Sequence, residues 1–192
     1  MKRKAKGEAG YLNYKKKVEL LITIFSFGLV AALLILGIVQ TKQRLNLLTV
    51  VAALGAIPAC KRLVELIVRF PYRSIAEEKA KEIREKTPNI TVIYDMILTS
   101  SEKVMPVDCI AISEHTICGY AGNPKVDMGY AGEHLKKILK QNGYQNASVK
   151  IFDRYPAFLT RAEGMNSIAA VENQDCAAKE KRIADIILNV SM

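Results

Sequence analysis

Two long apolar runs dominate the first third of the chain. Residues 18–40, VELLITIFSFGLVAALLILGIVQ, carry a single charge, Glu19. A helix needs about 20 apolar residues to cross the hydrocarbon core of a bilayer. The second run, residues 45–60, has 16 residues, and we expect the segment LVELIVRF beyond it to lie along the membrane interface. The pattern predicts a transmembrane helical hairpin; a single crossing followed by a buried or interfacial helix is the alternative.

Shorter periodic segments follow from residue 74. Helical spacing predicts a helix with Ser74 as N-cap, which we expect to form a stalk between membrane and domain. In the first predicted strand, strict alternation puts Tyr94 and Met96 on one face, together with Ile90, Val92 and Leu98. The other predicted elements are strands over 89–100, 107–112, 116–120 and 147–152, a helix over 129–144, a weaker fifth strand over 155–161 and one broken or two short helices over 163–190.

These elements define the expected fold class. The prediction is an N-terminal transmembrane helical hairpin plus a small cytoplasmic α+β (mixed α/β) domain, in the order α-β-β-β-α-β-(β)-α. The expected divisions are a basic cytoplasmic segment over 1–17, the hairpin and juxtamembrane segment over 18–73, and the cytoplasmic α+β domain over 74–192. A cleaved signal peptide is not expected, because the first apolar run is too long and no cleavage pattern follows it.

The net charge of +9 belongs to the first third of the chain. Residues 1–73 hold 13 Lys/Arg and three acidic residues, whereas residues 74–192 hold 15 and 16. Basic residues cluster at both ends of the apolar region, and only Lys42 and Arg44 lie between the two runs. This asymmetry predicts a multi-pass protein of the inner (cytoplasmic) membrane with both termini in the cytoplasm. The expected partners are the lipid bilayer, anionic headgroups and another protein, but not nucleic acid, because the globular part is nearly neutral.

The stretch VDCIAISEHTICGYAGN, residues 107–123, carries the densest set of reactive side chains. Its residue types that bind metals or act as nucleophiles are Asp108, Cys109, His115 and Cys118. A hairpin turning at Glu114-His115 places Cys118 opposite Ala111, so the thiols do not form the close pair that structural zinc needs.

The two hairpin thiols are expected to be small buried side chains. All four cysteines, Cys60 and Cys176 included, are expected to be in their reduced form. A thiol nucleophile needs a base, and His134 on the following helix is the available one, although nothing in the sequence places it near either thiol. We therefore predict no catalytic, cofactor-binding or metal-binding residue, and no cofactor.

Residues 74–155 resemble the nuclease-related domain of the restriction-endonuclease-like superfamily. That core runs helix, three-stranded meander, helix, strand, and its second strand starts with an aliphatic-Asp pair, here VDCIAIS. The resemblance implies that Asp108 stands at the first metal-ligand position. It also implies that Ala121 and Asn123 stand where the family has its Glu and Lys, so a degenerate, non-cleaving domain is expected.

The leading functional expectation is an integral membrane protein that presents a small, non-catalytic cytoplasmic domain for protein interaction or scaffolding. One alternative is a membrane-tethered, metal-dependent, nuclease-like hydrolase, in which Asp108 is the catalytic residue. The other is a membrane-tied sensor of a small ligand. No enzymatic activity is expected from the leading hypothesis.

Overall fold

The computed structural model describes residues 4–41, 47–100, 102–172 and 177–191. Two compact units are present: a helical unit, Leu12–Arg73, and an α/β unit composed of Met1–Tyr11 and Ser74–Met192. The predicted features at Lys42, Arg44 and Cys176 lie outside the described residues.

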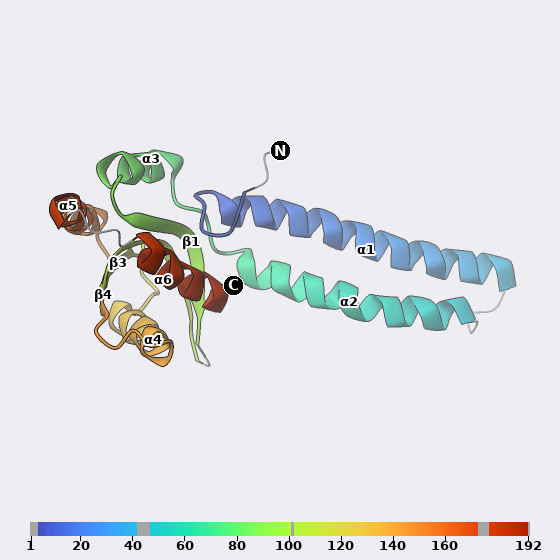
Figure 1. Ribbon diagram of the computed structural model, residues 1–192. Coiled ribbons are helices and arrows are strands. Elements are labelled where there is room, and N and C mark those ends of the chain that lie inside the picture. The colour runs from blue at the N-terminus through green and yellow to red at the C-terminus, as the bar shows by residue number, and fades with distance from the viewer. Residues whose placement is uncertain (1–3, 42–46, 101, 173–176, 192) are drawn as a thin grey trace. The chain divides into compact units, whose positions relative to one another are not determined.

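The helical unit consists of α1 (Tyr11–Thr41) and α2 (Leu47–Arg69), which lie side by side (Figure 1). Both are long and apolar enough to cross a membrane, as judged by length and composition. Helix α2 continues through Pro58 to Arg69. The segment expected to lie along the membrane interface, residues 63–70, thus begins inside this helix, and its placement relative to a bilayer stays a prediction.

Polar contacts join the beginning of α1 to the end of α2. The Arg69 guanidinium donates to the Glu19 carboxylate, whose residue is 8% exposed. The Lys16 ammonium donates to the carbonyl of Phe70 at 2.9 Å and to that of Tyr72. Because a buried charge is costly without a partner, the Glu19–Arg69 pair holds this end of the hairpin together.

The α/β unit is built on one four-stranded mixed sheet in the order β1-β2-β3-β4. The first three strands are antiparallel neighbours, and β4 runs parallel to β3. The strands are β1 (Thr91–Thr99), β2 (Val104–Ser113), β3 (Thr116–Tyr120) and β4 (Ser148–Phe152). The helices are α3 (Glu77–Lys86), α4 (Met128–Gln141), α5 (Tyr155–Glu172) and α6 (Ala177–Val190). The mixed α+β class is confirmed.

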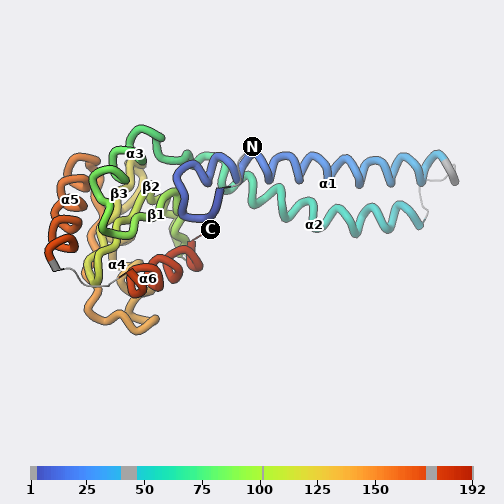
Figure 2. The backbone as a smooth tube through the Cα atoms, turned by 45° about the horizontal axis from the view of Figure 1, so that its top comes forward, coloured from blue at the N-terminus to red at the C-terminus, as the bar shows by residue number. Residues whose placement is uncertain are grey.

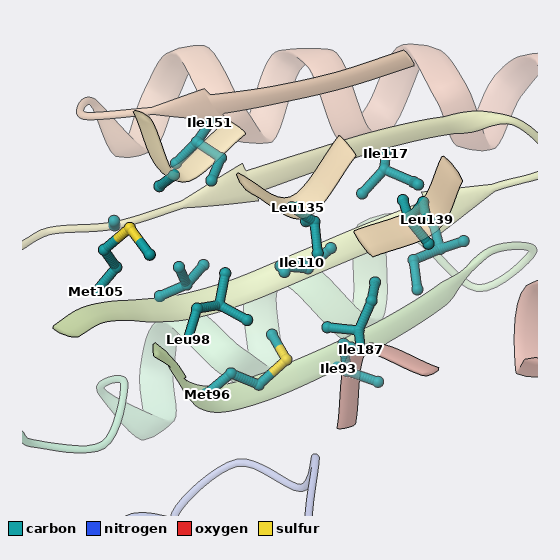
Figure 3. Packing of buried hydrophobic residues seen from close by; sticks show 14 of the residues in the cluster. Ile93, Met96, Leu98, Met105, Ile110, Ile117, Leu135, Leu139, Ile151 and Ile187 are labelled. Atoms are coloured by element: carbon teal, nitrogen blue, oxygen red, sulfur yellow. The ribbon is translucent and has the colours of Figure 1, made fainter. Parts of the chain in front are cut away.

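Helices cover both faces of the sheet. Helices α4 and α6 pack on one face around the α4/α6 cluster, and α3 and α5 pack on the other around the α3/α5 cluster. Figure 3 shows the first cluster, where Leu135 of α4 and Ile187 of α6 lie near Ile110 of β2. Both faces of β1 and β2 are therefore buried along most of their length, which accounts for the near-continuous apolar runs in these two strands.

Helix α3 belongs to the α/β unit, so the predicted stalk is wrong. Its apolar residues Ala80 and Ile83 are buried in the α3/α5 cluster. The helix begins at Glu77, after an N-cap at Ala76 that has no side-chain hydrogen bond, and Ser74 is not the cap. An amphipathic stripe indicates that one face is covered but not what covers it, and here the sheet does.

The predicted fifth strand at 155–161 is also wrong, because these residues start α5. Pro156 lies in the first turn, where its missing N–H costs no helical hydrogen bond. Phe158, Leu159 and Ala162 then follow at helical spacing and are buried. The C-terminal region forms two helices, α5 and α6, which is one of the two arrangements predicted for residues 163–190.

Strand alternation breaks once in β1 and once in β2, at the same level. Tyr94 belongs to the α3/α5 cluster, whereas Met96 belongs to the α4/α6 cluster. The expectation that Tyr94 shares a face with Met96 and Leu98 is therefore wrong. The residue between them, Asp95, has a left-handed backbone with φ 57°, and in β2 the matching change of face occurs between Val107 and Cys109.

The register of the two strands continues unchanged through the break. Tyr94 pairs with Cys109 and Met96 pairs with Val107, which leaves Asp95 opposite Asp108. Asp95 is 3% exposed, and its Oδ1 accepts a hydrogen bond of 2.9 Å from the backbone N–H of Ile75. Aspartate and asparagine tolerate a left-handed conformation better than other non-glycine residues do. Asp95, the acidic residue within an otherwise apolar strand, is therefore well suited to the left-handed backbone at this position.

The segment 4–10, here called the N-terminal arm, lies along the outer edge of β1 (Figure 2). The Gly7 carbonyl accepts a hydrogen bond of 2.8 Å from the Tyr94 N–H. The Lys6 ammonium donates to the carbonyls of Leu188 and Ser191, each at 2.5 Å. Further along the strand, Leu98 forms an isolated antiparallel bridge with Ser191. Both ends of the chain therefore cover the free edge of β1, which protects it from pairing with other chains.

Replacing Asp95 tests the origin of the break. We expect Asp95→Ala to lower the free energy of unfolding by about 2 kcal/mol, because alanine is strained at this φ and the Ile75 N–H loses its acceptor. Asp95→Asn keeps both properties and is expected to stay close to the parent protein. Denaturant unfolding of the full chain in detergent measures both; an equal loss in the two variants would contradict this explanation.

Candidate functional site

The β2–β3 hairpin turns at Glu114-His115, as predicted. Ser113 pairs with Thr116 and Ala111 pairs with Cys118 across it. The His115 Nε2 lies 3.6 Å from the Glu114 Oε1, and neither side chain is buried. From α6, Glu180 accepts hydrogen bonds from the backbone N–H groups of Thr91 (3.0 Å) and Glu114 (3.3 Å), so it fixes the turn to the start of β1. The turn histidine is therefore part of a surface turn.

The two hairpin thiols are buried in the α3/α5 cluster. Cys109 is 0% exposed and Cys118 is 1% exposed. Burial, aided by the nearby Asp108 and Cys118, holds the pKa of Cys109 well above its usual range, and burial raises the pKa of Cys118 to about 12. At pH 8 a thiol with that pKa is ionised in roughly one molecule in 10,000. Neither thiol is poised to act as a nucleophile.

His134 cannot serve as their base. Helix α4 packs on the α4/α6 face of the sheet, whereas both thiols belong to the α3/α5 cluster on the other face. The His134 ring is stacked against that of Tyr130, with 6.3 Å between the centroids. The sheet therefore separates the thiols from the histidine that the sequence offered as a partner.

Asp108 lies beside the break in β2 and is half-buried. Its Oδ2 accepts a hydrogen bond of 2.7 Å from the Gly122 N–H. Burial raises the pKa of Asp108, and the Asp95 carboxylate opposite raises it further; the Gly122 hydrogen bond and the Lys79 ammonium oppose these effects without cancelling them. Asp108 therefore keeps its proton to a higher pH than an ordinary aspartate.

The surroundings of Asp108 combine one cation with aromatic rings. The Lys79 ammonium lies 5.4 Å from the ring centroid of Tyr120 and 4.8 Å from that of Tyr155. A Cβ added to Gly122 would lie 3.0 Å from Asp108 Oδ2 and 2.7 Å from Tyr120 Oη, so a larger residue at this position would have to displace the Tyr120 side chain. The site thus draws residues from α3, β1, β2 and the end of β3.

Sequence reasoning identified Asp108 but missed its neighbours. Asp95 could have been found, because it is the one charge inside the apolar run ITVIYDMILT. Lys79 gave no signal, since it is one of several lysines on the polar side of α3. Gly122 follows β3 and carries no reactive side chain, so its close approach to Asp108 becomes visible only in three dimensions.

The site does not fit a catalytic divalent cation. No group of three His, Cys, Asp or Glu side chains that could hold a metal ion is found in the part of the chain that the structure describes. Ala121 is 1% exposed within the α4/α6 cluster, and the Oδ1 of Asn123 accepts a hydrogen bond from the Lys125 N–H. Neither supplies a further carboxylate, and hard cations are bound by several converging oxygens.

Comparisons with known proteins give no relative. No protein-family model, no curated protein and no solved structure matches the chain. The resemblance to the nuclease-related domain therefore stays a prediction.

The raised pKa of Asp108 has a measurable consequence. In a folded protein, an aspartate with a raised pKa lowers stability as pH rises from the unfolded-state pKa through the folded-state pKa. Asp108→Asn removes this loss and keeps an acceptor for the Gly122 N–H. We expect it to raise the melting temperature at pH 7, with a gain that shrinks toward pH 3. A gain that is equal at both pH values would contradict a titration effect.

Proposed function

We propose that the chain is an integral protein of the inner (cytoplasmic) membrane, anchored by a helical hairpin, that presents the α/β unit in the cytoplasm for protein interaction or scaffolding. The membrane part rests on two helices whose length and composition suit a bilayer. Their outward side chains are apolar and exposed, for example Phe25 (74%) and Leu54 (62%). Such exposure is unfavourable in water and favourable in lipid.

The observation that carries the proposal is the N-terminal arm. Residues of the arm hydrogen-bond to Tyr94, Leu188 and Ser191, and therefore belong to the same folded unit as residues 74–192. A folded unit lies on one side of a membrane, so the chain between Tyr11 and Ser74 has to cross an even number of times. Two crossings by α1 and α2 satisfy this condition, and a single crossing does not. The excess of basic residues at both ends of the hairpin favours the cytoplasmic side.

A non-catalytic role agrees with the state of the reactive side chains. Both thiols of the α/β unit that lie within the described residues are buried and protonated. Asp108 is bound by a backbone N–H and lacks the converging oxygens of a metal site. Binding therefore accounts for this unit better than chemistry.

A protein partner is supported by α5. Its inward residues pack on the sheet, yet Ile168 is 55% exposed and Val171 is 85% exposed near its C-terminal end. These two apolar side chains lie one turn apart on the helix, and a protein partner that covered them would remove their apolar surface from water.

Reporter fusions test the topology. We expect a reporter that is active only in the cytoplasm to be active when fused at either terminus, because an even number of crossings keeps both ends on one side. A fusion within the segment 42–46, which connects α1 and α2, is the matched control and is expected to be active only with an external reporter. Terminal fusions that report opposite sides would contradict the hairpin.

Crosslinking in native membranes tests the interaction. A photo-crosslinking residue at Val171 is expected to form a reproducible adduct with one protein, because this position lies on the exposed apolar end of α5. The same residue at Lys137, exposed on α4, is the control. Equal labelling at the two positions, or none at Val171, would count against α5 as the contact.

A metal-dependent hydrolase is the second candidate, favoured by one observation, the placement of Asp95 opposite Asp108. This candidate requires that Mg²⁺ or Mn²⁺ raise the melting temperature of the full chain and that Asp108→Asn abolish the rise. The binding proposal requires no metal-dependent shift in either protein and no cleavage of DNA or of a phosphodiester substrate.

A further inference from the structure

A cavity of about 290 Å³ lies between the N-terminal arm and the α3–β1 region of the α/β unit. Gly7 and Glu8 of the arm form one side; Arg84 at the end of α3 and the strand residues Val92 and Tyr94 form much of the rest. At about 30 Å³ per water, the space corresponds to roughly ten water molecules. It is large enough for a small metabolite and too small for most drug-sized ligands.

The cavity carries one charge of each sign. The Arg84 guanidinium lies close enough to Tyr94 to lower the pKa of its phenol, and a guanidinium has five N–H donors. The Glu8 Oε2 accepts a hydrogen bond of 3.0 Å from the Ala5 N–H. Within the described residues, neither side chain takes part in an ion pair, although both line the same cavity. A ligand with only a negative charge would be repelled by Glu8, and a ligand with only a positive charge would be repelled by Arg84.

The remaining wall is apolar and aromatic. Ile90, Val92 and Tyr94 line the cavity, and Ile90 and Tyr94 are 8% and 4% exposed. Burial raises the pKa of Tyr94 to about 12, so its phenol stays neutral at physiological pH. A ligand that suits this wall has an apolar portion beside its charged groups.

We propose that this cavity binds a free α-amino acid with an apolar side chain. The ligand carboxylate would pair with Arg84, whose planar fork matches a carboxylate, and the ligand ammonium would pair with Glu8. The ligand side chain would lie against Ile90, Val92 and Tyr94. Each charge of the cavity then gains a partner, and the ligand as a whole adds no net charge.

Binding at this place connects the ligand to the arm. Glu8 belongs to the arm and Arg84 belongs to α3, so one ligand would bridge two segments that are far apart in sequence. A ligand that binds the closed arm better than the open arm shifts the population toward closure. The amino acid is therefore expected to protect the arm from trypsin, which cleaves after Lys4 and Lys6. This inference does not depend on the protein partner proposed above.

The test uses the full chain in detergent micelles, with L-leucine and L-phenylalanine as probes in calorimetry and thermal unfolding. We expect at least one probe to bind and to raise the melting temperature. 4-Methylpentanoate, which lacks the amine of leucine, and 3-methylbutylamine, which lacks its carboxylate, are expected to bind at least about tenfold more weakly, because each leaves one cavity charge unpaired.

Charge-neutralising variants locate the site. Arg84→Gln and Glu8→Gln are each expected to weaken binding about tenfold or more and to abolish the protection from trypsin. Both side chains are exposed, so the fold is expected to tolerate the changes. Arg182→Gln on α6 and Glu133→Gln on α4, which are also exposed, are the matched controls and are expected to bind as the parent does.

Three results would overturn the proposal. The first is the absence of binding by both amino acids, and the second is equal binding of leucine and its amine-free analogue. The third is parent-like affinity in both Arg84→Gln and Glu8→Gln. These outcomes are distinct from failure of the topology, because the reporter fusions report only on which side of the membrane each terminus lies.

Discussion

The backbone hydrogen bond between the Gly7 carbonyl and the Tyr94 N–H determines how the molecule is organised. It makes the first residues of the chain part of the α/β unit, together with the Lys6 contacts to the end of α6. The two apolar helices are therefore an insertion between two segments of one folded unit. An insertion has to return to its starting point, and a helical hairpin does this with the fewest residues. The same contact covers part of the free edge of β1, so one interaction joins the ends of the unit and protects the sheet from pairing with other chains.

A second constraint acts inside the sheet. In both β1 and β2 the alternation of side chains between the two faces of the sheet is interrupted once. The two interruptions lie at the same level, at Asp95 and Asp108. If only one of the two strands changed face, its side chains beyond that point would lie on the opposite side of the sheet from those of the paired strand, and the two strands would no longer contribute to the same clusters. The paired change keeps both clusters intact at the cost of placing two acidic residues opposite each other. The raised pKa of Asp108 is one result of that arrangement, and the tight approach of Gly122 is another. The two facing acidic residues, which resemble part of an active site, are thus also a consequence of the geometry of the two strands.

Local sequence patterns correctly predicted those elements whose pattern is compatible with only one type of secondary structure. The Glu114-His115 turn, the four strands of the sheet, the helix predicted over 129–144 and the two apolar helices follow from spacing and from residues that stop regular structure. Pro156 is compatible with two local structures, because proline suits both an edge strand and the first turn of a helix. Packing against the sheet, which the local sequence does not reveal, selects the helix. The face of each β1 residue could not be derived, since a single left-handed residue shifts every later side chain. The arm was missed because lysines near a membrane span indicate orientation, whereas here Lys6 binds carbonyls more than 180 residues away.

The position of the arm also has a consequence for how the chain folds. The ribosome produces the arm before its partners at Leu188 and Ser191, which are separated from Lys6 by 182 and 185 residues. The arm therefore remains without these partners while the residues between them, including α1 and α2, are synthesised. Closing so long a loop is entropically costly and slow compared with local pairing, so the β2–β3 hairpin and the β3–α4–β4 unit can form beforehand. Completion of the α/β unit is thus a late event in folding. Until the arm and Ser191 are in place, the edge of β1 stays uncovered, and its unpaired backbone groups are free to pair with other chains.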